Sequence, residues 1–282
     1  MEFFKRIFMK KKNQEIIKSE ESIEKNIKES IQCNSENCGC KSCEHKEEKN
    51  GDYLKNICIQ IETIPCEPNP YFVVNDESAK FFEEFEIRMT TICRMYSINS
   101  IFLKEYQKVS RESLTSTRDN EKEFSKYSKC YFINNNAFKE IHHMSNLLNI
   151  FMIFEVLLKN ITKDIAYDKH LDLEEIQNKN MSYLNSYILF LEEAMKNRFS
   201  LDENERNFIG IVRKIRNDYL HDYMTEIPES IEKEIVKIFN LRTGKRITVD
   251  EYFIENTCKI FGEIAKRLEG SYWEYKNKFL EK

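Results

Sequence analysis

Glycine and proline are so scarce in this chain that they exclude most folds built from strands and tight turns. Only 6 glycines and 4 prolines occur among 282 residues. An all-β sandwich or barrel needs a turn about every ten residues, and glycine and proline supply many of those turns. Apolar side chains here instead recur every three or four residues over long stretches, which is the spacing of amphipathic helices. The sequence therefore predicts an all-α fold.

The chain changes character near residue 70. Residues 1–70 hold a basic amphipathic segment at 1–12, a cysteine cluster, and an alternating segment at 54–64 that predicts a short strand or strand pair. Helical patterns then follow at 76–109, 137–160, 172–198, 201–222, 228–240 and 249–280. The polar stretch 111–128 is expected to be a surface loop. We therefore expect a small N-terminal region, 1–70, and a helical bundle domain, 71–282.

Several helix starts carry local signals. Ser200 with Glu203, and Thr248 with Glu251, have the spacing of capping boxes. Pro228 lies where the first turn of a helix tolerates proline. These signals predict helices that begin near residues 201, 228 and 249.

Charge and hydropathy narrow the function classes. The 44 basic and 48 acidic side chains give a net charge of −4, which excludes a global electrostatic attraction to nucleic acid. No stretch of 18 apolar residues is free of polar interruption. The most apolar one, 144–158, contains Ser145, Asn146 and Glu155, and we interpret it as a core helix rather than a transmembrane segment. With no visible secretory signal, we expect a cytoplasmic protein with reduced cysteines.

The segment 216–223, with the sequence RNDYLHDY, holds the residues best suited to chemistry. It ends a predicted helix whose apolar stripe is separate from Arg216, Asn217 and His221. Asn217 and His221 are four residues apart and share a face, whereas Arg216 and His221 are about 140° apart around the helix. Two such helices facing each other would bring an arginine and a histidine together.

Histidine and arginine suit the cleavage of an RNA backbone. A 2′-hydroxyl attacks the adjacent phosphodiester when a base removes its proton and an acid protonates the leaving 5′-oxygen, and histidine serves both tasks near neutral pH. Arginine matches the phosphate oxygens and stabilises their charge in the transition state, without any metal ion. Arg213 and Lys214, just before the motif, are candidate RNA-binding residues.

The same segment resembles the R-N-x3-H signature of HEPN domains, which are helical, usually dimeric, and often metal-independent ribonucleases. With Tyr223 it is similar to the R-x4-H-x-Y form of HEPN toxins, whose tyrosine is modified by a nucleotidyltransferase antitoxin. This resemblance implies that Arg216 and His221 are catalytic, that Asn217 supports them, and that Tyr223 is either a supporting residue or a modification site. It further implies that the chain is a homodimer. It also implies a role as a toxin in a toxin–antitoxin pair, or in abortive infection and antiviral defence, controlled by an antitoxin or a trigger protein.

Four cysteines fall close together near the N-terminus: Cys33, Cys38, Cys40 and Cys43. The pair Cys40 and Cys43 has the spacing of a zinc knuckle, although the other spacings are not those of a common zinc finger. A structural zinc ion and a loop of reduced thiols are the two interpretations. Cys93, Cys130 and Cys258 fit core positions as small hydrophobic residues. Adjacent residues on a helix point 100° apart, so we interpret His142 and His143 as core or surface histidines rather than as a pair of metal ligands.

Two functions therefore remain open. The first is a metal-independent HEPN-type endoribonuclease that leaves 2′,3′-cyclic phosphate and 5′-hydroxyl ends and needs no cofactor for catalysis. The second is a non-catalytic helical module that dimerises or binds a partner, with the cysteine-rich loop as its recognition element.

Overall fold

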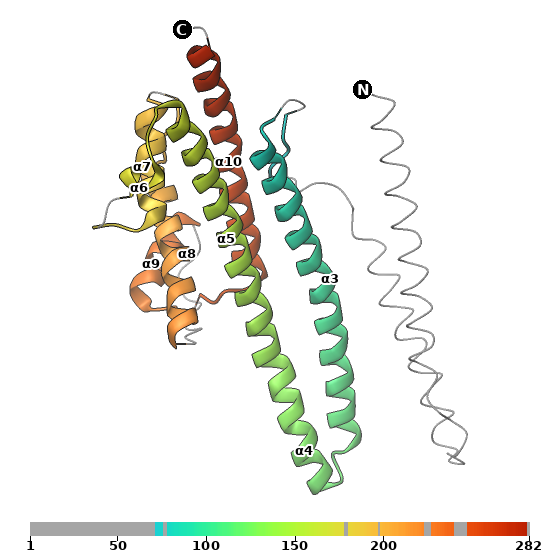
Figure 1. Cartoon of the computed structure of the whole chain (residues 1–282). Coiled ribbons are helices and arrows are strands. Elements are labelled where there is room, and N and C mark those ends of the chain that lie inside the picture. Colours follow the sequence, from blue (N-terminus) through green and yellow to red (C-terminus); the bar gives the residue numbers. More distant parts are fainter. Residues whose placement is uncertain are drawn as a thin grey trace, which may run out of the picture. The chain divides into compact units, whose positions relative to one another are not determined.

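The computed structural model describes residues 71–75, 78–177, 180–196, 198–222, 227–239 and 247–280. These residues form eight α-helices and one short π-helix, with no strand among them (Figure 1). The all-α prediction is confirmed for this part of the chain. The expected strand at 54–64 and the whole region 1–70 lie outside the described residues.

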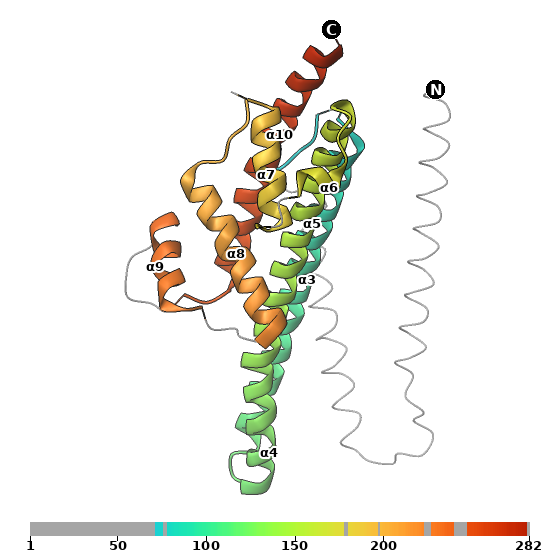
Figure 2. The same cartoon turned by 60° about the vertical axis from the view of Figure 1, so that its left-hand side comes forward.

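A long helical hairpin opens the bundle. Helix α3, Lys80–Ser116, is followed by α4, Glu121–Phe132, the π-helix η2, Ile133–Ala137, and α5, Phe138–Asp168. The last three are contiguous and lie antiparallel beside α3 (Figures 1 and 2).

The predicted surface loop at 111–128 is wrong, because the chain reverses direction within only a few residues. Helix α3 runs to Ser116 and α4 begins at Glu121. The side chain of Asn120 accepts a hydrogen bond from the Glu123 N–H at 3.3 Å and so caps the new helix. The stretch is polar because most of its side chains face water, which is compatible with a helix as well as with a loop.

The rest of the bundle consists of shorter helices and one long closing helix: α6, Leu173–Ile176, α7, Tyr183–Ala194, α8, Glu203–Asp222, α9, Glu229–Ile238, and α10, Glu251–Leu280. The single helix expected at 172–198 is broken between α6 and α7. The side chain of Ser182 caps the new start by accepting a hydrogen bond from the Asn185 N–H at 3.3 Å. Serine at an N-cap stabilises the helix start, so the break has a local cause.

Two of the predicted helix caps lie two residues too early. Helix α8 has a reciprocal capping box in which the Glu205 N–H donates to Asp202 Oδ1 at 2.8 Å and the Asp202 N–H donates to Glu205 Oε2 at 3.0 Å. Helix α10 begins after Asp250, whose Oδ1 accepts from the Phe253 N–H at 3.0 Å. Asp202 and Asp250 are therefore the N-cap residues, in place of the predicted Ser200 and Thr248. Pro228 does lie at the start of α9, as predicted.

Helix α5 forms the centre of the core. The segment 135–168 is long and apolar enough to cross a membrane by length and composition, but 61% of its most apolar window is buried inside the protein. Phe154 stacks on Phe261 of α10, with ring centroids 4.2 Å apart, and Phe208 of α8 packs edge-on against the same ring. This burial fits the predicted core helix.

The segment before α3 lies against α10 at very close range. A Cβ atom at Gly262 would come within 2.8 Å of both the Cβ and the carbonyl oxygen of Tyr71. Further along α10, the buried carboxylate of Glu269 accepts hydrogen bonds from the Asn75 N–H, at 3.1 Å, and from the Ser78 hydroxyl. The absence of a side chain at Gly262 thus lets this segment contact α10 directly.

We expect Gly262→Ala to lower the free energy of unfolding by about 1–3 kcal/mol, because the new methyl group overlaps backbone atoms that have little room to move. Gly270→Ala on the same helix is the matched control. Its Cβ would meet nothing within 4 Å, so the better helix propensity of alanine raises stability by up to about 1 kcal/mol. Urea denaturation measures the unfolding free energy of both variants. If the two substitutions change it by the same amount, the close contact at Gly262 is contradicted.

Candidate functional site

Helix α8 presents the Arg-Asn-x3-His segment on its last two turns. The helix is anchored by a stripe of buried side chains at Phe208, Ile211, Val212 and Ile215, as the sequence pattern predicted. Tyr219 is half-buried and packs against the same core. The stripe fixes the rotation of the helix, and it therefore fixes where the neighbouring polar side chains point.

Arg216 turns inward. Its guanidinium carbon lies 5.8 Å from the centre of the Phe151 ring on α5, a cation–π contact. Its Nη1 donates a hydrogen bond to Asn217 Oδ1 at 3.0 Å. Among the described residues, no carboxylate lies within ion-pair distance of this half-buried charge.

Arg216 opens onto a pocket of about 250 Å³ between α5, α7 and α8. Arg213 and Asn217 also line the pocket, and Arg213 donates a hydrogen bond to the hydroxyl of Ser182, the N-cap of α7. Glu155 of α5 is the acidic side chain in the lining, which gives two positive charges against one negative. This balance suits an anionic group such as a phosphate.

His221 turns outward. It is exposed in the last turn of α8 and does not line the pocket of Arg216. An α-helix places residues five apart at about 140° and about 7.5 Å along its axis, in agreement with the two different environments. Arg213, Arg216 and Asn217 therefore share one pocket of a single copy of the chain, and His221 lies outside it.

The remaining predicted site residues differ in what the structure describes. Lys214 is exposed on α8. Tyr223 and the cysteines Cys33, Cys38, Cys40 and Cys43 lie outside the described residues. Within the described ranges, no group of three or more histidine, cysteine or acidic side chains is placed to hold a metal ion.

Sequence reasoning missed the side chains that other helices bring to this pocket. Phe151, Glu155 and Ser182 lie 31–65 residues before Arg213 and Arg216 in the chain, and no motif links them. The one available signal was Ser182, because a serine just before an apolar helical pattern is a typical N-cap.

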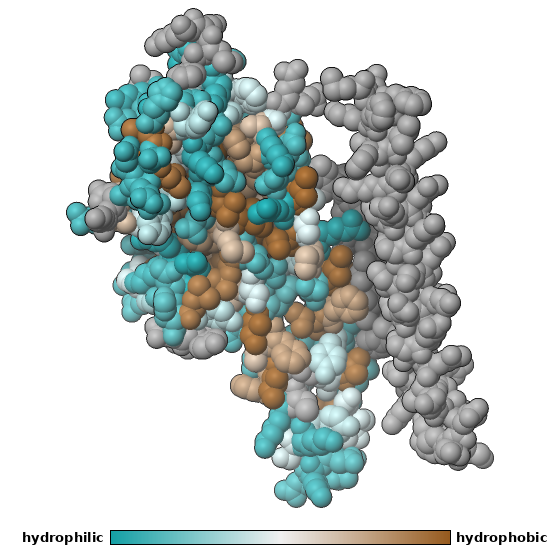
Figure 3. Space-filling view, viewed as in Figure 1, coloured by the Kyte–Doolittle hydropathy of each residue, from teal (hydrophilic) through white to brown (hydrophobic). Residues whose placement is uncertain are grey.

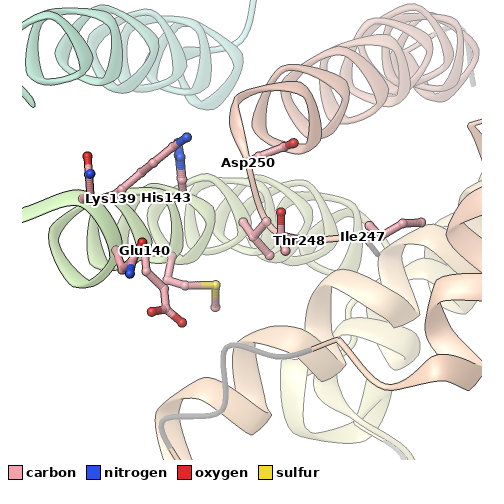
Figure 4. A pocket seen from close by; sticks show the side chains of 10 residues that line it. Lys139, Glu140, His143, Ile247, Thr248 and Asp250 are labelled. Atoms are coloured by element: carbon pink, nitrogen blue, oxygen red, sulfur yellow. The ribbon is translucent and has the colours of Figure 1, made fainter. Parts of the chain in front are cut away.

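A second pocket, of about 500 Å³, lies between α5, η2 and the segment that leads into α10. Figure 4 shows Lys139 and His143 rising from α5 on the side of Asp250, while Glu140 points the other way. The π-helix η2 contributes Asn135 and Asn136 to the lining. One basic and two acidic side chains line this pocket, so it favours anions less than the pocket of Arg216 does.

A chain of hydrogen bonds runs beside this second pocket and joins α3 to α5. The amide nitrogen of Asn146 donates to His142 Nδ1 at 3.2 Å, so the proton of that ring lies on Nε2, which donates to Ser100 Oγ at 3.1 Å. Tyr96 Oη shares a hydrogen bond with His143 Nδ1, with the two atoms 2.8 Å apart, and the side chain of Ser100 hydrogen-bonds the same tyrosine. His143 Nε2 is buried and has no hydrogen-bond partner among the described residues.

Burial lowers the pKa of both histidines in this chain. The pKa of His143 falls to about 4, mainly through burial and further through the positive charges of His142 and Lys139. Burial also lowers the pKa of His142. Both rings are therefore neutral at pH 7 and hold the two helices together, in agreement with their interpretation as core histidines.

The chain matches no protein-family model, no curated protein and no solved structure. The site is therefore defined by the side chains of α5, α7 and α8 described above.

We expect the free energy of unfolding to fall as the pH drops from about 6.5 to about 4. The unfolded chain takes up a proton at His143 near pH 6.5, whereas the folded protein keeps this ring neutral down to about pH 4. His143→Gln should flatten the decline by up to about 1.4 kcal/mol per pH unit. Chemical denaturation between pH 4 and 8 measures both curves. The plots of unfolding free energy against pH for the wild type and His143→Gln should be parallel above pH 7 and diverge below it. If they stay parallel below pH 6, His143 does not cause the loss of stability.

Proposed function

We propose that the chain is a metal-independent endoribonuclease of the HEPN type. The observation that supports this most is the position of Arg216, a half-buried arginine without a carboxylate partner among the described residues. Asn217 orients it and Arg213 shares its pocket. A half-buried cation that forms no ion pair is stabilised when an anion binds beside it, and the single carboxylate in the lining leaves the pocket with a net positive charge. The phosphodiester of RNA is an anion of the right kind.

Arg216 and His221 have separate roles in the proposed reaction. The 2′-oxygen of one nucleotide loses its proton to a histidine and bonds to the adjacent phosphorus. The bond from phosphorus to the 5′-oxygen breaks, and that oxygen takes up a proton from an acid. The products are a 2′,3′-cyclic phosphate and a 5′-hydroxyl. Arg216 stabilises the negative charge that builds up on the phosphate oxygens in the transition state.

The proposed active form is a homodimer. One imidazole is either protonated or neutral at a given moment, so a simultaneous base and acid require two histidines. A second copy supplies the other His221, and its exposed position at the end of α8 is open to such an approach. In this dimer Arg216 holds the phosphate while the two exposed histidines reach it from the surface.

The biological role follows the resemblance of the motif. We propose an intracellular toxin, or an effector of defence against phage, that cuts cellular RNA when released by an antitoxin or a trigger protein. Residues 1–70 are the proposed regulatory region, with a structural zinc ion at the cysteine cluster. Tyr223 is the proposed modification site.

We expect His221→Ala to lower the rate of RNA cleavage by at least about 100-fold, because a positioned acid or base contributes that much or more. The test incubates the purified full chain with a mixed RNA in EDTA and identifies the product ends. Cyclic phosphates from the wild type support the proposal. His170→Asn is the matched control, since His170 is exposed and its positive φ of 58° is one that asparagine tolerates.

Arg216→Ala separates this site from a contaminating nuclease, and it should be as inactive as His221→Ala while remaining folded by circular dichroism. Equal cleavage by wild type and both variants would refute the role of the motif. Cleavage that EDTA abolishes would refute the metal-independent reaction.

A second function, a partner-binding module, is favoured by the exposed apolar side chains on one part of the bundle. They lie on the second half of α3, on α4 and η2, and at the start of α5, where Figure 3 shows apolar surface. Their exposed fractions run from 38% to 66% at Phe102, Tyr106, Phe124, Phe132, Ile133, Phe138 and Ile141. Exposed apolar side chains that gather on one part of a surface are typical of a protein interaction site.

Replacing Phe132 and Ile133 together by aspartate should weaken self-association measured by sedimentation. The unfolding free energy should change by less than about 0.5 kcal/mol, because both side chains are exposed. Loss of self-association together with RNA cleavage would identify this surface as the interface of the catalytic dimer, whereas cleavage retained by a monomeric variant would contradict the proposed dimeric active form. Unchanged association would contradict the role of this surface as an interface.

A further inference from the structure

Two cysteines from distant parts of the chain meet inside the bundle. Cys93 of α3 and Cys258 of α10 are 165 residues apart in sequence, yet their sulfur atoms lie 3.5 Å from each other. Neither is in a disulfide bond. Cys258 is 3% exposed, whereas Cys93 is only half-buried. Part of Cys93 therefore reaches solvent, whereas Cys258 beside it is enclosed.

The two helices hold these cysteines in a defined place. Cys258 lies in the buried stripe of α10 between Ile254 and Phe261, and Cys93 lies one turn beyond the buried Met89 on α3. The hydroxyl of Tyr71 donates to the carboxylate of Glu255 at 3.0 Å, close to the pair. A disulfide has sulfur atoms about 2.05 Å apart, so closure requires an approach of only about 1.5 Å.

The surroundings make the two thiols chemically different. The hydrogen bond between the two sulfur atoms lowers the pKa of Cys93. The pKa of Cys258 is raised by its hydrogen bond to Cys93, by burial and by the negative charge of the nearby Glu255. The thiolate is the nucleophilic form of cysteine, so Cys93 is the more reactive of the two as well as the more accessible.

We propose that Cys93 and Cys258 are an oxidation site at which a hydroperoxide forms a reversible disulfide between α3 and α10. The Cys93 thiol loses its proton, and the thiolate attacks one oxygen of hydrogen peroxide. The O–O bond breaks, Cys93 becomes a sulfenic acid, and the hydroxide that leaves takes up the Cys93 proton to form water. The Cys258 sulfur then attacks the Cys93 sulfur and the S–OH bond breaks. The released hydroxide combines with the Cys258 proton to form water. Two thiols are oxidised, one peroxide is reduced to two waters, and a thiol reductant restores the pair.

The test treats the full chain with hydrogen peroxide, digests it with trypsin without reduction, and identifies cross-linked peptides by mass spectrometry. Cleavage after lysine and arginine places Cys93 in peptide 89–94 and Cys258 in peptide 247–259, with no other cysteine in either. We expect these two peptides to be joined in the oxidised protein and separate after reduction. Oxidation of other cysteines without this link would overturn the proposal.

The order of the two steps is tested by trapping sulfenic acid with dimedone. Cys258→Ser should accumulate the adduct on Cys93, because the second thiol is missing. Cys93→Ser should leave Cys258 without an adduct, because the buried thiol reacts poorly. The reverse pattern would overturn the assignment of Cys93 as the first nucleophile. The wild-type peptide link stands as an independent readout if either variant folds poorly.

The effect on the fold gives a third readout. A disulfide between residues 165 apart restricts the unfolded chain, so the oxidised wild type should melt several degrees higher than the reduced protein. Cys93→Ser, which keeps the core volume nearly unchanged, should show no such rise after the same treatment. A rise of equal size in this variant would assign the stabilisation to another pair of cysteines.

Discussion

The burial of helix α5 is the constraint on which the rest of the bundle depends. Its side chains are buried at fourteen positions, which cover more than half of its circumference, and the exposed Met152 and Lys159 mark the narrower face that meets water. Each large apolar side chain loses roughly 1.5–3 kcal/mol of stabilisation if it is left exposed. Helices α3, α7, α8 and α10 all pack against α5, and their positions follow from the need to cover it.

The candidate site is a consequence of how α8 is held against this core. On one side, Phe208 packs on the rings of Phe253 and Phe261 from α10. On the other, Arg206 pairs with Glu192 of α7, and Glu205 pairs with Arg267 of α10. These contacts fix both the depth and the rotation of the helix. The two turns that follow thus carry Arg216 toward α5 and α7 and His221 toward the surface.

The sequence predicts the helices better than it predicts their ends and connections. The long periodic stretches that became α5, α8 and α10 were identified because their apolar spacing persists over many turns. The loop expected at 111–128 was a poor inference, since a polar composition is shared by loops and by helices exposed on most sides. The predicted capping boxes lie two residues too early because aspartate is as good an N-cap as serine or threonine. The sequence alone does not decide which of these residues becomes the N-cap, because that also depends on how the helix packs in the bundle.

The pocket was predictable only in part, for a related reason. A local motif reveals residues that one helix brings together, and it revealed Arg213, Arg216 and Asn217. It cannot reveal Phe151, Glu155 or Ser182, because these reach the pocket through the packing of α5 and α7 against α8. Helical periodicity did show that Arg216 and His221 point in different directions, and the structure agrees.

The separation of Arg216 from His221 determines what kind of active site the motif can form. An arginine that binds phosphate gains most from a partly buried place, where water competes less for its charge. A histidine that exchanges protons with a substrate on the surface gains most from exposure. The end of α8 offers both a partly buried arginine and an exposed histidine, provided that the reacting phosphate lies at the mouth of the pocket, between the two side chains. Two copies placed with their α8 ends together would meet that condition, because each phosphate held by an Arg216 would then lie between two exposed imidazoles.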